Sequence, residues 1–329
     1  MRVALVCPYS WTSPGGVQSH VRGLARALVD RDIRVEVIAP ADGPVPGPAV
    51  HAVGPTVPIR DNGSVVPVAL APAAARRVLA LLRRGGFDVV HLHEPVIPAV
   101  SLAALLAGPG ALVGTFHRYA DAPGWYRVFG AFCRAALAHL DVRVAVSEAA
   151  RRHVEATCPG EYLIVPNGID AGPEPRERRA AGEGRVVFVG RPDPRKGVPV
   201  LLDAFARLPG RPTLDLVGVG PDALRAARVA GLPLERIRAH GYVDDRRRDE
   251  ILRAGDVFCA PSVSGESFSI VTAEAMAAGL PVVATRVGGL PELVGPEAGR
   301  LVPPRDPAST AAALQSLLSD DAARRRASR

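Results

Sequence analysis

Short runs of apolar, mostly β-branched residues alternate with helical segments along the whole chain. Such runs are typical of parallel strands buried on both faces, and their alternation with helices predicts an α/β fold with parallel sheets. We therefore expect two doubly wound, Rossmann-like domains. The predicted strands are 2–6, 34–39, 88–92, 111–115, 142–146 and 162–165 in the first half, and 185–189, 213–217, 236–240, 256–259 and 281–284 in the second.

The connecting segments have the apolar spacing of helices. Val17, Val21, Leu24 and Leu28 fall on one helical face, which predicts a helix packed against the first sheet. Residues 96–116 carry no charge and approach the length of a membrane span. Because Pro98 and the sequence Gly108-Pro109-Gly110 interrupt the segment, it predicts a buried helix over 99–107 followed by a strand.

A loose, charged segment, 171–184, contains Gly172-Pro173-Glu174-Pro175 and is the best candidate linker. It divides the chain into an N-terminal domain, 1–170, and a C-terminal domain, 185–329. Ligands of doubly wound sheets bind at the carboxyl ends of the strands, so we expect the two domains to face each other across a cleft that holds the ligand.

Two carboxylates frame a helix start in the second domain. Glu266 precedes an apolar helical run and Glu274, eight positions later, lies inside it. Free N–H groups and the positive dipole end favour phosphate at such a helix start. One carboxylate can then bind a hexose and the other a ribose, which suits a sugar nucleotide. The alternative is two acids near the start of an ordinary amphipathic helix.

Lys196 is the only lysine among 40 basic residues. In a chain that otherwise uses arginine, this exception indicates a site that needs a compact ammonium, and phosphate binding is such a need. Arg191 and Lys196 lie between an apolar strand and the helix that begins near Val198, so both can reach one anion. The alternative is a solvated basic turn. Gly15-Gly16 likewise opens a helix and lets backbone amides approach an anion, or forms a simple tight turn.

The net charge of +7 admits nucleic acid as a partner, but only 5% of residues are aromatic and no stacking or groove-reading motif is present. We expect no nucleic acid; an anionic membrane or a phosphorylated ligand suits the charge equally well. The apolar run at the start is too short for a signal peptide, which predicts a cytoplasmic protein. The four cysteines are far apart, and Asp30-Arg31-Asp32 is best interpreted as a surface turn, so we expect no metal site and no cofactor.

Together these motifs resemble the retaining glycosyltransferases of family 4, which have the two-domain GT-B fold; the resemblance spans nearly the whole chain. It implies that Arg191 and Lys196 hold the donor diphosphate, that Glu274 binds the ribose, and that Glu266 with the amides after it binds the hexose. The implied donor-binding residues are Gly16, Arg191, Lys196, Glu266, Ser267, Phe268, Ser269, Ile270 and Glu274.

Within the family, residues 7–20 are similar to the bacterial phosphatidylinositol mannosyltransferases, which use GDP-mannose. That likeness implies an acceptor side with His117 close to the transferred sugar. From the residues alone, His117 is equally a satisfied histidine at a strand end, and Asn62-Gly63 a plain turn. Arg118 stands near the place where those enzymes carry a lysine. The implied acceptor-binding residues are Tyr9, Gln18, Asn62, Gly63, Ser64, His117 and Arg118.

The segment 72–84 predicts a basic helix. Arg76 and Arg83 are seven apart, as are Arg77 and Arg84, so each pair returns to one helix face. With Val78, Leu79 and Leu82 as apolar neighbours, this surface could rest on anionic lipid, which predicts peripheral association with the inner face of the plasma membrane. The alternative is a solvated charged face.

We thus expect a hexosyltransferase that moves mannose from GDP-mannose to phosphatidylinositol or a related polyol lipid. The alternatives are a family 4 enzyme with another nucleotide-sugar donor or a soluble acceptor, and a non-catalytic sugar-nucleotide binder. Negative charge develops on the leaving diphosphate, where cations and helix N-termini can stabilise it without a metal. The expected catalytic residues are His117, Arg191, Lys196 and Glu266.

Overall fold

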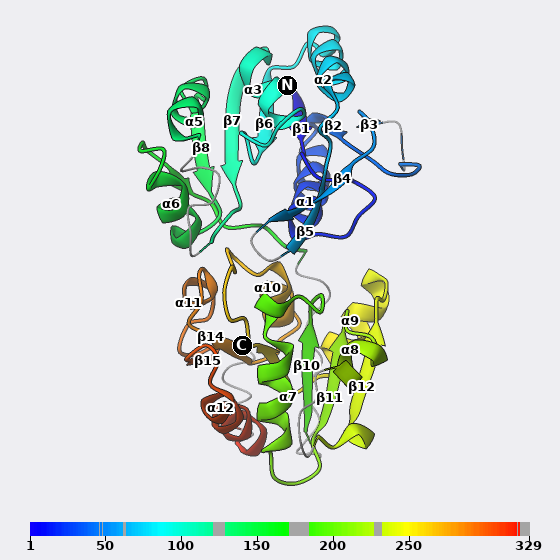
Figure 1. Ribbon diagram of the computed structural model, residues 1–329, viewed down its shortest axis with the longest axis vertical. Coiled ribbons are helices and arrows are strands. Elements are labelled where there is room, and N and C mark those ends of the chain that lie inside the picture. Colours follow the sequence, from blue (N-terminus) through cyan, green and yellow to red (C-terminus); the bar gives the residue numbers. More distant parts are fainter. Residues whose placement is uncertain are drawn as a thin grey trace. The chain divides into compact units, whose positions relative to one another are not determined.

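A computed structural model (Figure 1) describes residues 1–45, 47, 49–61, 64–120, 129–170, 184–226, 232–320 and 322. The chain divides into two compact units, Met1–Gly168 and Ile169–Arg329. Asn62, Gly63 and the predicted linker, apart from Gly184, lie outside the described residues.

Unit 1 contains a seven-stranded sheet in the order β3-β2-β1-β6-β7-β8-β9, and every pair of neighbours in it is parallel. Successive side chains of β1 enter two different cores, because Ala4 and Val6 belong to one apolar cluster and Val3 and Leu5 to the other. Both faces of the sheet are therefore covered. The strands are β1 (Arg2–Val6), β2 (Arg34–Ala39), β3 (Val50–Ala52), β6 (Val89–His93), β7 (Ala111–Phe116), β8 (Val142–Ala145) and β9 (Leu163–Ile164).

The helices of unit 1 cover this sheet with their apolar stripes. Val21 of α1 packs in one core, while Val78 and Leu82 of α2 and Leu105 of α3 pack in the other. The described helices are α1 (Gly16–Val29), α2 (Pro72–Gly85), α3 (Ser101–Ala107), α5 (Gly130–Leu137) and α6 (Glu148–Glu155).

An antiparallel pair, β4 (Val57–Asp61) and β5 (Ser64–Val68), stands apart from the parallel sheet. A bridge between Tyr9 and Val68 and a hydrogen bond from Ser10 N to Pro67 O (3.1 Å) attach β5 to the loop after β1. The pair thus lies beside the carboxyl end of β1.

Unit 2 contains a six-stranded parallel sheet in the order β12-β11-β10-β13-β14-β15. Its strands also alternate between two cores: Val186 and Phe188 of β10 pack in the cluster that contains α7 and α12 residues, whereas Val187 and Val189 pack with α9 and α10 residues. The strands are β10 (Arg185–Val189), β11 (Thr213–Val217), β12 (Ile237–Gly241), β13 (Val257–Ala260), β14 (Val282–Thr285) and β15 (Gly299–Val302).

The helices of unit 2 follow these strands in the alternating order of a doubly wound fold (Figure 1). Short 3-10 turns are η1 (Pro194–Lys196) and η2 (Leu234–Arg236). The α-helices are α7 (Val198–Ala206), α8 (Pro221–Ala226), α9 (Asp245–Ala254), α10 (Ile270–Ala277), α11 (Leu290–Leu293) and α12 (Pro307–Ser319).

Asp215 is a fully buried carboxylate in the middle of this second sheet. Its oxygens accept hydrogen bonds from Arg185 Nε (2.5 Å) and pair with His240 Nε2 (2.6 Å), on the two neighbouring strands. Burial alone would raise the pKa of Asp215, but these two partners outweigh it and the pKa is lowered. A charged group inside the sheet is thus stabilised by its neighbours.

Every predicted strand is present, with each end within one residue of its predicted position. The predicted helix over 99–107 begins only at Ser101, because Ala99 has a φ of 63°. The strands β3, β4, β5 and β15 were not predicted. Among the helices in the described part of the chain, none is long and apolar enough to cross a membrane.

Candidate functional site

The loop after β10 carries the lone lysine and is held in a tight turn. Asp193 accepts a hydrogen bond from Arg195 N (3.0 Å) and pairs with Arg195 Nη2 (2.9 Å). Gly197 then has a φ of 69°, and a Cβ at this position would lie 2.0 Å from Pro261 O. Since a side chain fits neither the φ nor the space, glycine is required where the loop meets the end of β13.

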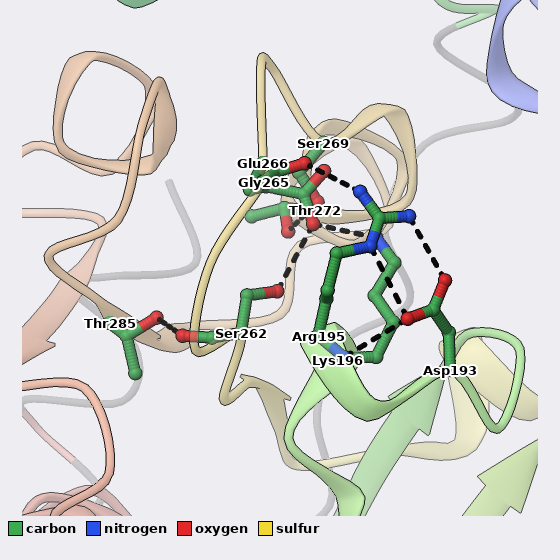
Figure 2. Close-up of polar contacts among 9 residues, drawn as sticks. All are labelled: Asp193, Arg195, Lys196, Ser262, Gly265, Glu266, Ser269, Thr272 and Thr285. Atoms are coloured by element: carbon green, nitrogen blue, oxygen red, sulfur yellow. Dashed lines mark hydrogen bonds and ion pairs between the residues drawn. The ribbon is translucent and has the colours of Figure 1, made fainter. Parts of the chain in front are cut away.

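Lys196 reaches from this turn to Glu266. Its Nζ lies 2.6 Å from Glu266 Oε2, and Ser262 Oγ donates to the same oxygen at 3.0 Å (Figure 2). Arg195 Nη1 donates to Gly265 O (3.3 Å). The Glu266 residue is only 8% exposed, so its carboxylate is fixed by a cation and a hydroxyl within a largely buried cluster.

Side-chain hydrogen bonds also hold the segment between β13 and α10 in place. Thr285 Oγ1 donates to Ser262 O (2.5 Å), as Figure 2 shows, and Ser269 Oγ lies 2.8 Å from Thr272 Oγ1. Ser269 has a φ of 72°, a left-handed conformation that costs a non-glycine residue about 1–2 kcal/mol. Such strain is typical of functional sites. Ser269 caps α10 in this conformation, and Phe268 beside it is buried.

Glu274 lies inside α10 with its side chain 18% exposed. Its Oε1 is 3.5 Å from Arg248 Nη2, and its Oε2 is buried with no hydrogen-bond partner among the described residues. Burial raises the pKa of Glu274; Arg248 opposes this shift, whereas Asp249, Asp245 and Asp170 add to it. A buried carboxylate oxygen without a partner is costly to the protein and is available to a ligand hydroxyl.

The predicted donor residues are thus only partly brought together. Lys196 and Glu266 are in direct contact, and Arg191 is an exposed residue just beyond β10. The sequence missed Arg195, which stands next to the lysine, and Arg248, which approaches Glu274. No motif singles out Arg195, because the chain is rich in arginine throughout.

In unit 1, His117 directly follows β7 and is 8% exposed. Its Nε2 lies 2.9 Å from His93 Nδ1, and its backbone N–H donates to Glu94 Oε1 (2.6 Å). Two further imidazoles are close: His91 stacks on His93 with ring centroids 4.6 Å apart, and His20 meets both His93 and His117 edge to face. The sequence predicted only His117, although the alternation His91-Leu92-His93 was a signal.

Burial keeps all four rings neutral near pH 7. It lowers the pKa of His20 and His91 to about 4, and the pKa of His93 and His117 falls well below the ordinary value. His117 therefore offers neutral hydrogen-bonding groups.

Of the other acceptor residues, Gln18 is buried and donates from Nε2 to Ser10 O (3.1 Å). A Cβ on Gly15 would lie 2.4 Å from Gln18 Oε1, so glycine leaves room for this amide. Gly16 is the first residue of α1. Tyr9 and Arg118 are half-buried, and the side chain of Ser64 is not among those described.

The arginines of α2 are exposed, as predicted. Val78 and Leu82 are buried in the core beneath the helix, so their predicted place on a lipid-facing surface was wrong. The hydrophobic stripe of a surface helix faces the protein, and of the three predicted apolar neighbours Leu79 alone retains partial exposure. The Asp30-Arg31-Asp32 segment forms an exposed turn after α1.

Two family models match the chain. The one described as Glycosyltransferase Family 4 matches residues 14–172, and the one described as Glycosyl transferases group 1 matches residues 183–320. The chain is 41% identical to the phosphatidyl-myo-inositol mannosyltransferase of Mycobacterium leprae (strain TN), with 99% of this chain and 90% of that protein covered. It is 34% identical to the D-inositol 3-phosphate glycosyltransferase of Acidothermus cellulolyticus, with 96% and 82% covered.

Solved structures of glycosyltransferases share the fold of this chain. Sucrose-phosphate synthase from Thermosynechococcus elongatus aligns with a TM-score of 0.76 at 24% identity, covering 100% of this chain and 92% of that one. HepE from Anabaena, crystallised with UDP and glucose, aligns with a TM-score of 0.77 at 22% identity and the same coverage. At these identities the likeness shows the fold alone.

Proposed function

The chain belongs to glycosyltransferase family 4 and has the GT-B fold, and from that premise we propose that it transfers mannose from GDP-mannose to phosphatidylinositol or a related polyol lipid, with retention of the anomeric configuration. The contact of Lys196 with Glu266 carries the donor half of this proposal. The full-length similarity to phosphatidyl-myo-inositol mannosyltransferase supports the choice of donor and acceptor.

The donor diphosphate is assigned to Lys196 and Arg191. An ammonium has three N–H donors, and Glu266 takes one of them at 2.6 Å, so two remain for phosphate oxygens. As the sugar leaves, charge grows on the diphosphate, and a cation already fixed in a largely buried cluster stabilises it without reorganisation. Glu266 orients the lysine and, in this proposal, also accepts hydrogen bonds from hexose hydroxyls together with the segment after it.

The ribose is assigned to Glu274. Its buried Oε2 has no partner within the described structure, and a ribose hydroxyl would supply one. A neutral sugar hydroxyl suits this carboxyl group, whose pKa is raised, better than an anionic phosphate does.

On the acceptor side, the proposal places His117 beside the transferred sugar. Its backbone is held by Glu94 and its ring by His93, so it presents a fixed, neutral imidazole. Such a group can exchange hydrogen bonds with sugar hydroxyls. Tyr9, Gln18, Asn62, Gly63, Ser64 and Arg118 are proposed to complete the acceptor site.

Association with the inner face of the plasma membrane is proposed to depend on the four exposed arginines of α2. Each basic residue near an anionic surface contributes about 1 kcal/mol. Val78 and Leu82 are buried and add nothing to this contribution, which comes from the arginine charges.

A panel of donors and acceptors tests the function. The full chain is incubated with GDP-mannose, UDP-glucose or UDP-N-acetylglucosamine, each with phosphatidylinositol vesicles or with soluble inositol 3-phosphate, and products are identified by mass spectrometry. We expect hexose addition to the lipid with GDP-mannose only, and NMR should show an α-linkage. Transfer from a uridine donor would show that GDP-mannose is the wrong donor. Transfer to inositol 3-phosphate alone would show that phosphatidylinositol is the wrong acceptor. Tight nucleotide binding with no product from any pair would indicate a non-catalytic binder.

A further inference from the structure

Three histidines from distant parts of the sequence converge in unit 1. His20 comes from α1, His93 ends β6, and His117 follows β7. One ring nitrogen from each lies within 4.8 Å of the others. The His20 ring centroid is 5.4 Å from that of His93 and 5.3 Å from that of His117, and the His93 and His117 centroids are 5.2 Å apart. The fold has therefore gathered three imidazoles around one point.

The spacing is close to that of a zinc site. Zinc binds imidazole nitrogens at about 2.0–2.1 Å in tetrahedral geometry, which puts two ligand nitrogens about 3.4 Å apart. His93 Nδ1 and His117 Nε2 are now 2.9 Å apart and share a proton. A zinc ion bound by both nitrogens would replace that proton and open this pair by about 0.5 Å. The His20 nitrogen would have to move further, because the three ligand atoms now lie within 4.8 Å of one another. Zinc binds imidazoles in their neutral form, through one ring nitrogen each.

A second observation also points to a ligand. His93 is fully buried, and its Nε2 has no hydrogen-bond partner within the described part of the chain. When His93 donates from Nδ1 to His117, this Nε2 is a bare lone pair in the protein interior. Buried polar atoms are nearly always satisfied, and this one gives the displaced proton a place: when a cation takes Nδ1, the proton moves to Nε2 and His93 stays a neutral ligand.

The neighbouring His91, unlike His93, has a hydrogen-bond partner for its Nε2. Its Nε2 lies 2.7 Å from Thr115 Oγ1, so it already has a partner. His20 is half-buried and is therefore the most exposed of the three histidines. Three protein ligands with an open fourth position form the arrangement of metal sites that bind water or an exogenous ligand.

We propose that unit 1 binds one divalent transition-metal ion through His20, His93 and His117. Imidazole nitrogens favour zinc, cobalt, nickel and copper, whereas magnesium and calcium prefer oxygen, so the site selects the former group. Because the proposed function uses His117 beside the sugar, metal and substrates compete for it, and zinc is a reversible inhibitor. Only this inhibition depends on the proposed function; the metal binding does not.

The binding test uses metal-free full chain and either Zn²⁺ in calorimetry or Co²⁺ in visible absorption. We expect one ion per chain, no binding of Mg²⁺, and a Co²⁺ spectrum of nitrogen ligation without a thiolate charge-transfer band, since all four cysteines are buried. His20→Gln should weaken zinc binding at least tenfold. His139→Gln, in an exposed histidine of the same unit, is the matched control and should bind as the wild type does.

Equal zinc affinity in His20→Gln and wild type, or no binding by a wild type with native circular dichroism, would overturn the proposal. His20→Gln must show the same thermal unfolding as the control, so that a lost site is not a lost fold. In the transfer assay, zinc should inhibit the wild type reversibly, with recovery on adding EDTA, and should inhibit His20→Gln at least tenfold less. If zinc binds but does not inhibit, the metal site stands and the proposed competition between metal and substrates at His117 is wrong.

Discussion

Replacing Lys196 with alanine tests the donor site most directly. In the free protein this change removes the 2.6 Å contact between Lys196 Nζ and Glu266 Oε2, which leaves Ser262 Oγ as the described donor to that oxygen. In the proposed transfer reaction it also removes a positive charge from beside the leaving diphosphate. Both effects act on the same step of the proposed mechanism, because the lysine that is proposed to neutralise the phosphate also contacts the glutamate.

The size of the loss follows from the energy of a charged hydrogen bond. Such a bond contributes about 1.5–3 kcal/mol, and about 1.4 kcal/mol corresponds to a tenfold change in rate. Loss of the phosphate contact alone therefore predicts a decrease in kcat of about 10- to 150-fold. The lost orientation of Glu266 adds to this, so we expect a decrease of roughly two orders of magnitude.

The assay measures the initial rate of mannose transfer from saturating GDP-mannose. Arg207→Ala is the matched control, because it removes an exposed cation at the end of α7 that pairs with Asp203 of that helix. Circular dichroism should be native in both variants. Wild-type kcat in Lys196→Ala would refute the diphosphate assignment. The double variant with Glu266→Gln should lose less than the product of the two single losses, since the residues act as one unit.

Four further outcomes follow from the structure. Glu274→Ala should raise KM for the donor with little change in kcat, because a ribose contact is equally strong in ground and transition states; an unchanged KM would count against it. Replacing the four exposed arginines of α2 with glutamine should abolish sedimentation with phosphatidylinositol vesicles at moderate salt. Replacing exposed arginines of α9 is the control and should leave sedimentation unchanged. If both variants sediment equally, α2 has no role in membrane binding. Asp215→Asn should lower the free energy of unfolding in urea by about 1.5–3 kcal/mol at pH 7. The pKa of Asp215 is lowered in the folded protein, so the stability that this carboxylate contributes is present above its ordinary pKa and is lost as the pH falls through the folded-state pKa. The unfolding free energies of Asp215→Asn and the wild type should therefore converge in acid. A difference between them that does not depend on pH would argue against the ion pair. Gly197→Ala should lower the melting temperature by several degrees, because the added Cβ would lie 2.0 Å from Pro261 O. Gly23→Ala in α1 is the control and should not lower it, because a Cβ at Gly23 has no atom within 4 Å.

The parallel strands could be predicted from sequence because each is a continuous apolar run buried on both faces. The strands that escaped prediction lack that signal: β4 and β5 each contain a proline, Pro58 and Pro67, and β3 has only three residues. Their pairing is decided by tertiary contacts rather than by local pattern.

The site was predictable where a residue was exceptional in the chain. Lys196 was recognised because it is the only lysine, and Glu266 because of its spacing from Glu274. His20 and His93 could not be assigned, because no spacing in sequence relates residues on α1, β6 and the end of β7. Their association depends on the order of the strands, in which β6 lies between β1 and β7.

The backbone contacts between the loop after β10 and the segment after β13 determine how this donor site could be transplanted. Val263 N donates to Arg195 O at 2.7 Å, and Gly197 packs directly on Pro261. Neither contact involves a side chain that could adjust to a new neighbour. Exchanging residues 193–197 alone with those of another glycosyltransferase would therefore set a foreign turn against the native carbonyl of Pro261. Chimaeras that alter donor choice should instead exchange 193–197 and 261–269 as a single cassette.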